Sequence, residues 1–119
     1  METGDLRVNE QPTLGVMHII WVREHNRIAK ELNKMNSHWN DERIYQEARR
    51  IVNAQWQHII YNEFLPILLG NRFLKQFNLL PLTRGFSSHY RTDFNPSVTN
   101  NFASASFRVG HTLVTSVMK

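Results

Sequence analysis

The chain has 119 residues, of which 41% are hydrophobic and 20% charged, a composition typical of one globular domain. Lys and Arg number 14 and Asp and Glu number 10, so the net charge of +4 permits an anionic partner without requiring one. The absence of cysteine excludes disulfides, zinc thiolate sites, iron–sulfur clusters and a cysteine nucleophile within these residues.

The N-terminal twelve residues are polar, with no apolar stretch of the kind found in a secretory signal. No run of about 18 apolar residues predicts a membrane-spanning helix either. Helical periodicity begins near Thr13 and continues to Met35, with apolar residues at steps of three and four. This stripe comprises Leu14, Met17, Trp21, Ile28, Leu32 and Met35, with His18 and His25 at its edge.

The opposite side of this helix carries four basic residues, Arg23, Arg27, Lys30 and Lys34. Such a stripe could contact phosphates in a nucleic acid. The more ordinary interpretation is a solvated helix face, because Glu24 and Glu31 are spaced to pair with Arg27.

A second helix is predicted after a loop at 36–40, with Asn40 as its cap and Asp41 in its first turn. Pro66 should kink or end this helix, and Gly70 is typical of a helix stop. A short helix fits 71–77, and 78–95 reads as a long loop.

The last segment, 96–119, is predicted as one continuous helix capped by Asn95, with Pro96 in its first turn. Two of its faces are apolar, which is typical of a central helix. His111 follows Gly110 on one of these faces. A neutral imidazole there could bind a metal, although a hydrogen-bonded core histidine is the commoner case.

Patterns of catalytic residues are otherwise scarce. His18 and His25 share a helix face but are seven residues apart, which is wider than zinc ligands usually are. The chain lacks the H-E-x-x-H, G-x-S-x-G, Walker A and G-x-G-x-x-G motifs. The residue pattern therefore predicts an all-α fold of three main helices and a short one, without assigning a function.

Four stretches in series give the chain a family resemblance. They are GDLRVNEQP, WVREHNRIAKELNKMN, DERIYQEARRIVNAQWQHIIYNEFLPILLG and NPSVTNNFASASFRVGHTLV. Together they resemble consecutive parts of an animal haem peroxidase, from Gly4 to about Val114. The resemblance implies a slice of that mainly helical fold, with a distal-arginine segment at 4–12, a helical core at 13–77, a loop at 78–95 and a proximal-histidine helix at 96–119.

The resemblance also assigns roles to four residues. His111 matches the proximal histidine that ligates the haem iron, and Arg108 matches an arginine that pairs with a haem propionate. Arg7 matches the distal arginine above the iron. Glu10 matches the carboxylate that forms an ester with a haem methyl group in many members, whereas Gln11 stands where one member has a haem-bonded methionine.

By this resemblance the expected function is reduction of hydrogen peroxide and oxidation of a halide, phenol or similar small donor. The expected partners are haem, peroxide, that donor and the remainder of the peroxidase domain, with no nucleic acid and no membrane. Relatives are mostly secreted, although no signal peptide is visible here. The family's distal histidine, second ester carboxylate and calcium loop lie upstream of the matching segment, and an asparagine that orients the proximal histidine lies downstream.

A central fragment of a larger catalytic domain is therefore expected. Two alternatives stay open. One is a truncated or degenerate relative that no longer catalyses the reaction, and the other is a basic helical module that binds nucleic acid or another anion.

Overall fold

The computed structural model describes residues 4–114, and these contain helices and irregular segments but no β-strand. The predicted all-α class is confirmed. The chain divides into two compact units, Met1–Pro81 and Leu82–Lys119, and each is described by itself.

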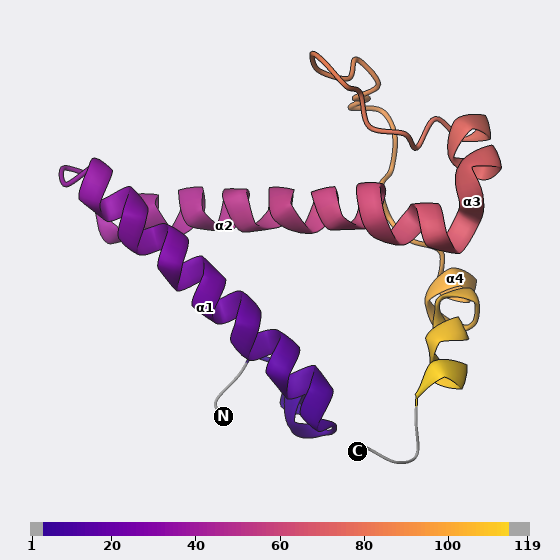
Figure 1. Ribbon diagram of the computed structural model, residues 1–119, viewed down its shortest axis with the longest axis horizontal. Coiled ribbons are helices and arrows are strands. Elements are labelled where there is room, and N and C mark those ends of the chain that lie inside the picture. Colours follow the sequence, from indigo (N-terminus) through magenta and orange to yellow (C-terminus); the bar gives the residue numbers. More distant parts are fainter. Residues whose placement is uncertain (1–3, 115–119) are drawn as a thin grey trace. The chain divides into compact units, whose positions relative to one another are not determined.

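The first unit begins with a short 3₁₀ turn, η1 (Leu6–Asn9), and the long helix α1 (Pro12–Met35) (Figure 1). The start of α1 is set by Gln11, whose side-chain oxygen accepts a hydrogen bond from the Leu14 N–H at 3.1 Å. Pro12 follows at the first helical position, where a missing N–H removes no helical bond. The end of α1 at Met35 is where the sequence predicts it.

A tight turn reverses the chain into α2 (Asp41–Ile59). Asn40 caps this helix as predicted, because its side-chain oxygen accepts from the Arg43 N–H at 2.9 Å. The two helices meet near the turn and diverge from it (Figure 1). Ala48 and Ile44 of α2 and Ile28 of α1 are buried, and Ala48 is completely so. These three residues form the core of the helix pair.

The helix continues past Ile59 as a π-helical turn, η2 (Ile60–Phe64), and then as α3 (Leu65–Gln76). Pro66 occupies the first turn of α3 and does not end the helical path. The break falls instead at Gly70, whose φ of 74° and ψ of 157° are almost confined to glycine. The short helix predicted at 71–77 corresponds to the part of α3 that follows this break.

The second unit is an irregular segment followed by α4 (Asn100–Ser104) and the 3₁₀ helix η3 (Ser106–Leu113). The prediction of one helix from 96 onward is therefore wrong for the described residues, and 115–119 lie outside them. Asn95 accepts the Ser97 N–H at 2.9 Å and so closes a turn instead of capping a helix. The chain is also non-helical at Ala105, where φ is −128° and ψ is −67°.

Local chemistry explains this shortened helix. The side-chain oxygen of Asn101 accepts the Phe102 N–H at 3.0 Å, and the Ser104 hydroxyl donates to the Asn100 carbonyl at 2.7 Å. Asn and Ser side chains that bond to nearby backbone groups compete with helical bonds. The apolar residues of this segment, including Val98 and Leu113, are exposed, so packing does not compensate for the weak helical propensity.

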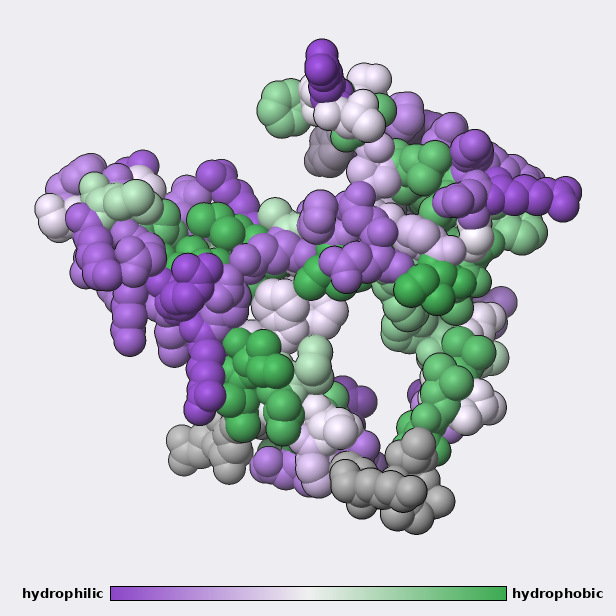
Figure 2. All heavy atoms as spheres, in the orientation of Figure 1, coloured by the Kyte–Doolittle hydropathy of each residue, from purple (hydrophilic) through white to green (hydrophobic). Residues whose placement is uncertain are grey.

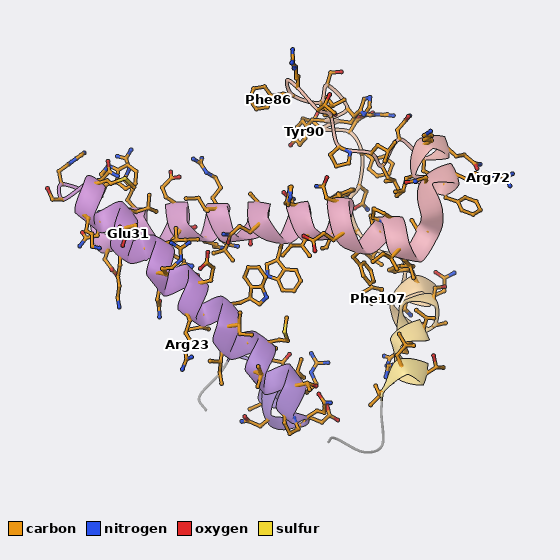
Figure 3. The ribbon with its side chains drawn as sticks, in the orientation of Figure 1. Arg23, Glu31, Arg72, Phe86, Tyr90 and Phe107 are labelled. Atoms are coloured by element: carbon orange, nitrogen blue, oxygen red, sulfur yellow. The ribbon has the colours of Figure 1, made fainter. Side chains whose placement is uncertain are left out.

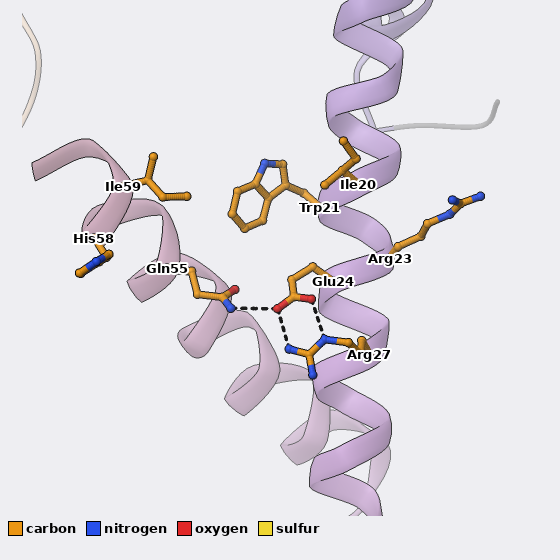
Figure 4. Close-up of a pocket in the computed structure, with 8 residues that line it drawn as sticks. All are labelled: Ile20, Trp21, Arg23, Glu24, Arg27, Gln55, His58 and Ile59. Carbon is orange, nitrogen blue, oxygen red and sulfur yellow. Dashed lines mark hydrogen bonds and ion pairs between the residues drawn. The ribbon is translucent and has the colours of Figure 1, made fainter. Parts of the chain in front are cut away.

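A polar network crosses between α1 and α2 (Figure 4). Arg27 donates two hydrogen bonds of 2.8 Å to the Glu24 carboxylate, and the Gln55 side chain donates a third to it at 2.9 Å. The hydrogen bonds from Arg27 and Gln55 lower the pKa of Glu24 from 4.5 to about 2, and Arg27 contributes most to this change. The network lies beside a hollow of about 560 Å³ that Trp21 and Ile59 also line.

We expect Glu24→Gln to remove part of the acid sensitivity of the helix pair. The folded-state pKa is lowered, so the stabilisation is complete above about pH 4.5 and is lost as the pH falls from there toward 2. The thermal midpoint by circular dichroism, measured from pH 6 to pH 2, should therefore decline less steeply in the variant. Glu31→Gln is the comparison, since the partner of Glu31 is Lys34 on α1 itself. An identical pH profile for wild type and Glu24→Gln would contradict this role.

Among residues 4–114, no helix combines the length and apolarity needed to cross a lipid bilayer.

Candidate functional site

Arg7 lies within the tight turn η1, and Glu10 caps the C-terminal end of that turn. Asp5 begins this turn, because its Oδ1 accepts the Arg7 backbone N–H at 2.9 Å. The Glu10 N–H closes the turn by donating to the Arg7 carbonyl at 2.9 Å. A three-residue step along a 3₁₀ turn brings two residues back to the same side, so the fold places Arg7 and Glu10 together.

Val8 anchors this turn to α1. Its side chain is 1% exposed, although Arg7 and Glu10 on either side of it are exposed. The Val8 carbonyl oxygen lies 3.5 Å from the point where a Cβ on Gly15 would stand, so the turn packs against α1 at van der Waals distance. Burial of one valine thus fixes the backbone that carries the proposed distal residues.

We expect Val8→Ala to release this turn from α1. Loss of two buried methyl-sized groups costs about 1.5 kcal/mol, which favours the open turn by roughly tenfold. Trypsin cleavage at the Arg7–Val8 bond should therefore be roughly tenfold faster under native conditions. Val16→Ala is the matched control, because Val16 is 52% exposed on α1 and its truncation should leave the cleavage rate unchanged. Equal rates for the two variants would rule out the anchoring role.

Arg7 and Glu10 both line a hollow of about 270 Å³, together with Asp5, Leu14 and His18. The Arg7 guanidinium donates to the Asp5 carboxylate through Nε at 3.0 Å and Nη2 at 2.6 Å. This contact holds the pKa of Asp5 well below its usual range, and it raises the pKa of Arg7 further above its ordinary value. The hollow therefore contains a guanidinium whose orientation is set by a neighbouring carboxylate.

His18 contributes an imidazole to the same hollow. Its Nδ1 lies 2.8 Å from the Leu14 carbonyl oxygen. A carbonyl only accepts, so Nδ1 carries the proton in this bond. In the neutral ring Nε2 is then an acceptor.

Arg108 and His111 lie three residues apart in η3. Because a 3₁₀ helix repeats every three residues, both side chains leave the same edge of the helix. The Nδ1 atom of His111 lies 3.0 Å from the Arg108 carbonyl oxygen. As at His18, this contact places the proton on Nδ1, so the neutral ring has its lone pair on Nε2. His111 is exposed, and its Nε2 is therefore accessible for coordination.

The structure thus pairs Arg7 with Glu10 in the first unit and Arg108 with His111 in the second. Within residues 4–114, no group of three or more His, Asp or Glu side chains is arranged to hold a metal ion. A single histidine is a complete protein ligand set for haem iron in many proteins, so His111 fits that group by its chemistry.

The basic face of α1 is partly neutralised. Arg27 pairs with Glu24, and Lys34 pairs with Glu31 at 2.8 Å. Glu31 therefore bonds to Lys34, where the spacing also allowed Arg27. Arg23 points away from α1 (Figure 3), and both Arg23 and Glu31 are exposed, so charges of both signs occupy this face.

Sequence reasoning missed two residues of the hollow. Asp5 belongs to no motif with its own chemistry, although an Asp two residues before an Arg at a turn can pair with it locally. His18 was placed at the edge of an apolar stripe, and only its position at the start of α1 brings it beside Arg7.

Comparison with known proteins gives consistent matches along the whole chain. The family described as animal haem peroxidase matches residues 1–119. Chorion peroxidase of Drosophila melanogaster is 47% identical over 112 residues, which cover 94% of this chain and 14% of that protein. Peroxidasin of the same species is 45% identical over 116 residues, 98% of this chain and 7% of that protein. The human peroxidasin homolog is 46% identical over 115 residues, 97% of this chain and again 7% of the relative.

Proposed function

Since this chain belongs to the animal haem peroxidase family, we propose that it provides residues for both sides of a haem in a peroxidase. The proposed reaction reduces hydrogen peroxide to two waters with two protons and two electrons, which come from a halide, a phenol or a similar donor. The chain spans 14% or less of the length of the relatives above, so the activity is proposed for a protein in which these residues act with others.

His111 is the proposed iron ligand, and its hydrogen bond is the observation that carries the proposal. Nδ1 donates to the Arg108 carbonyl, which leaves Nε2 as the nitrogen available to coordinate. When bound, the haem supplies the chemistry of O–O bond cleavage. The bond at Nδ1 makes the imidazole a better electron donor and fixes its orientation.

Arg7 is the proposed distal residue. Its guanidinium has five N–H donors, and two of them donate hydrogen bonds to the Asp5 carboxylate. The other donors and the fixed charge would stabilise the negative charge that develops on a departing oxygen. A positive group already oriented by the protein needs little rearrangement during the reaction, which is the usual source of such an effect.

Glu10 and Arg108 are the proposed covalent and ionic contacts to the haem. Glu10 shares the hollow with Arg7, so a carboxylate that forms an ester there would lie on the same side as the distal charge. Arg108 leaves η3 at the same edge as His111, which suits an arginine that pairs with a propionate near the iron ligand.

The remainder of the peroxidase domain is the proposed partner for the apolar surface. Large apolar side chains are exposed along the first unit, among them Ile20, Phe64 and Leu68, and Figure 2 shows apolar patches on its surface. Such exposed area usually marks a protein contact. A secreted location, which the resemblance implies, is part of the same proposal.

The test is peroxide-dependent oxidation of iodide and of a simple phenol by the intact, haem-loaded protein. We expect donor oxidation that requires both haem and peroxide. A protein that binds haem but oxidises neither donor would support the degenerate alternative. Salt-sensitive binding to duplex DNA, without haem binding, would favour the basic module instead.

A further inference from the structure

We propose that Asp5 is a positioning residue that holds the guanidinium of Arg7 in a fixed orientation toward the haem site. This inference rests on the proposed distal role of Arg7. It adds a residue that the family comparison does not assign, and it is drawn from the contacts around the turn η1.

The first support is the number of bonds that one carboxylate makes to one residue. Oδ1 of Asp5 accepts the Arg7 backbone N–H at 2.9 Å and the Nε–H at 3.0 Å, and Oδ2 accepts from Nη2 at 2.6 Å. Two side-chain bonds fix the plane of the guanidinium, and the backbone bond fixes the turn that carries it. Main chain and side chain of Arg7 are thus held by the same group.

The second support is the anchoring of the turn. Val8, the next residue, is buried, so the backbone of Arg7 cannot move freely relative to α1. The hollow that Asp5 and Arg7 line also contains Glu10 and His18, and the nearby His18 adds to the fall in the pKa of Asp5 that Arg7 mainly causes. The carboxylate therefore remains ionised under ordinary conditions.

A second Arg–Asp pair in this chain provides a control that distinguishes a positioning role of Asp5 from the general effect of losing an ion pair. Arg91 donates to Asp93 through Nε at 3.1 Å and Nη2 at 2.6 Å, nearly the same side-chain geometry at the same sequence spacing. Both residues lie in the long irregular segment, and neither is proposed to touch haem. Asp93→Asn is therefore a matched control for Asp5→Asn.

The consequence for the reaction is geometric. An exposed ion pair contributes little to stability, so Asp5→Asn should leave the fold intact. A misplaced catalytic group, however, can slow a reaction by one to two orders of magnitude. We therefore expect Asp5→Asn to lower kcat/KM for peroxide by roughly 10- to 100-fold in the intact haem-loaded protein, with the KM for the donor unchanged.

Four further measurements test the mechanism. Asp5→Glu, which retains the charge, should recover part of the rate, and Asp93→Asn should match wild type. In an Arg7→Gln background, Asp5→Asn should add no further loss, because the two residues act as a unit. In the 119-residue chain, the nitrogen–proton NMR signal of Arg7 Nε should shift and broaden in Asp5→Asn, whereas that of Arg91 should not.

The inference is overturned if Asp5→Asn leaves both the peroxide rate and the Arg7 signal unchanged, or if it slows the Arg7→Gln variant by the same factor as wild type. If Arg7→Gln alone has no effect on the rate, the distal role of Arg7 fails. The NMR signal then decides by itself whether Asp5 holds the guanidinium.

Discussion

Replacement of His111 by alanine is expected to abolish coordination of haem by this chain. The imidazole is the one proposed protein ligand to the iron, and its Nε2 lone pair is available because Nδ1 donates to the Arg108 carbonyl. Haem titrated into the variant should give the broad spectrum of unligated haem, whereas wild type should give a sharp Soret band at one equivalent. Nothing in the alanine side chain can replace the nitrogen ligand.

The control for this result is His89→Ala. His89 lies in the irregular part of the same unit and is exposed, as His111 is, so its loss tests for nonspecific binding by any surface histidine. Added imidazole should restore the ligated spectrum of His111→Ala, because it supplies the missing nitrogen ligand. An unchanged Soret band and affinity in His111→Ala, or an equal loss in His89→Ala, would contradict the assignment.

Replacement of Arg7 by glutamine is expected to slow the reaction with hydrogen peroxide by roughly 10²- to 10³-fold, the usual effect of removing one preorganised donor from a site where charge develops. Glutamine retains hydrogen-bonding capacity but loses the fixed charge and the two-bond contact with Asp5. Stopped-flow measurement of the haem spectrum against peroxide concentration gives the rate directly.

Arg91→Gln provides the matched comparison for this variant, because Arg91 makes the same kind of contact with Asp93. Its peroxide rate should equal that of wild type. Haem affinity should also be unchanged in Arg7→Gln, since the proposed role is in the reaction. A rate within twofold of wild type would show that Arg7 is not the distal group.

The predictable parts of the fold are those with a specific local signal. Asn40 and its acidic first turn identify the start of α2, and the observed cap bond has that origin. Gly70 also marks a real break, because its backbone angles are unfavourable for other residues. Pro66 was a weaker signal, since proline fits the first turn of a helix and here the helical path continues through it.

The last segment shows where periodicity fails. Its apolar residues recur at helical spacing, yet the segment contains Asn100, Asn101, Ser104 and Ser106, whose side chains bond to the backbone or favour non-helical conformations. Propensity of this kind is overridden by tertiary packing when the apolar faces are covered. In the described residues these faces are exposed, so the local preferences prevail.

The candidate site depended on a different kind of inference. Residue patterns alone favour a core histidine at His111 and a surface residue at Arg7, because neither belongs to a short motif with its own chemistry. The family resemblance identifies both residues as candidates, and the structure adds one local contact for each. Nδ1 of His111 is hydrogen-bonded to the Arg108 carbonyl, and Arg7 is hydrogen-bonded to Asp5. Both contacts depend on backbone turns that periodicity does not predict.

The central claim is that Nε2 of His111 coordinates the haem iron in the haem-loaded protein. Resonance Raman spectroscopy of the reduced haem protein, prepared with ordinary and with ¹⁵N-labelled histidine, observes that bond directly. We predict an iron–nitrogen stretching band that shifts on labelling and disappears in His111→Ala. A labelled-histidine band that persists unchanged in His111→Ala would contradict the claim.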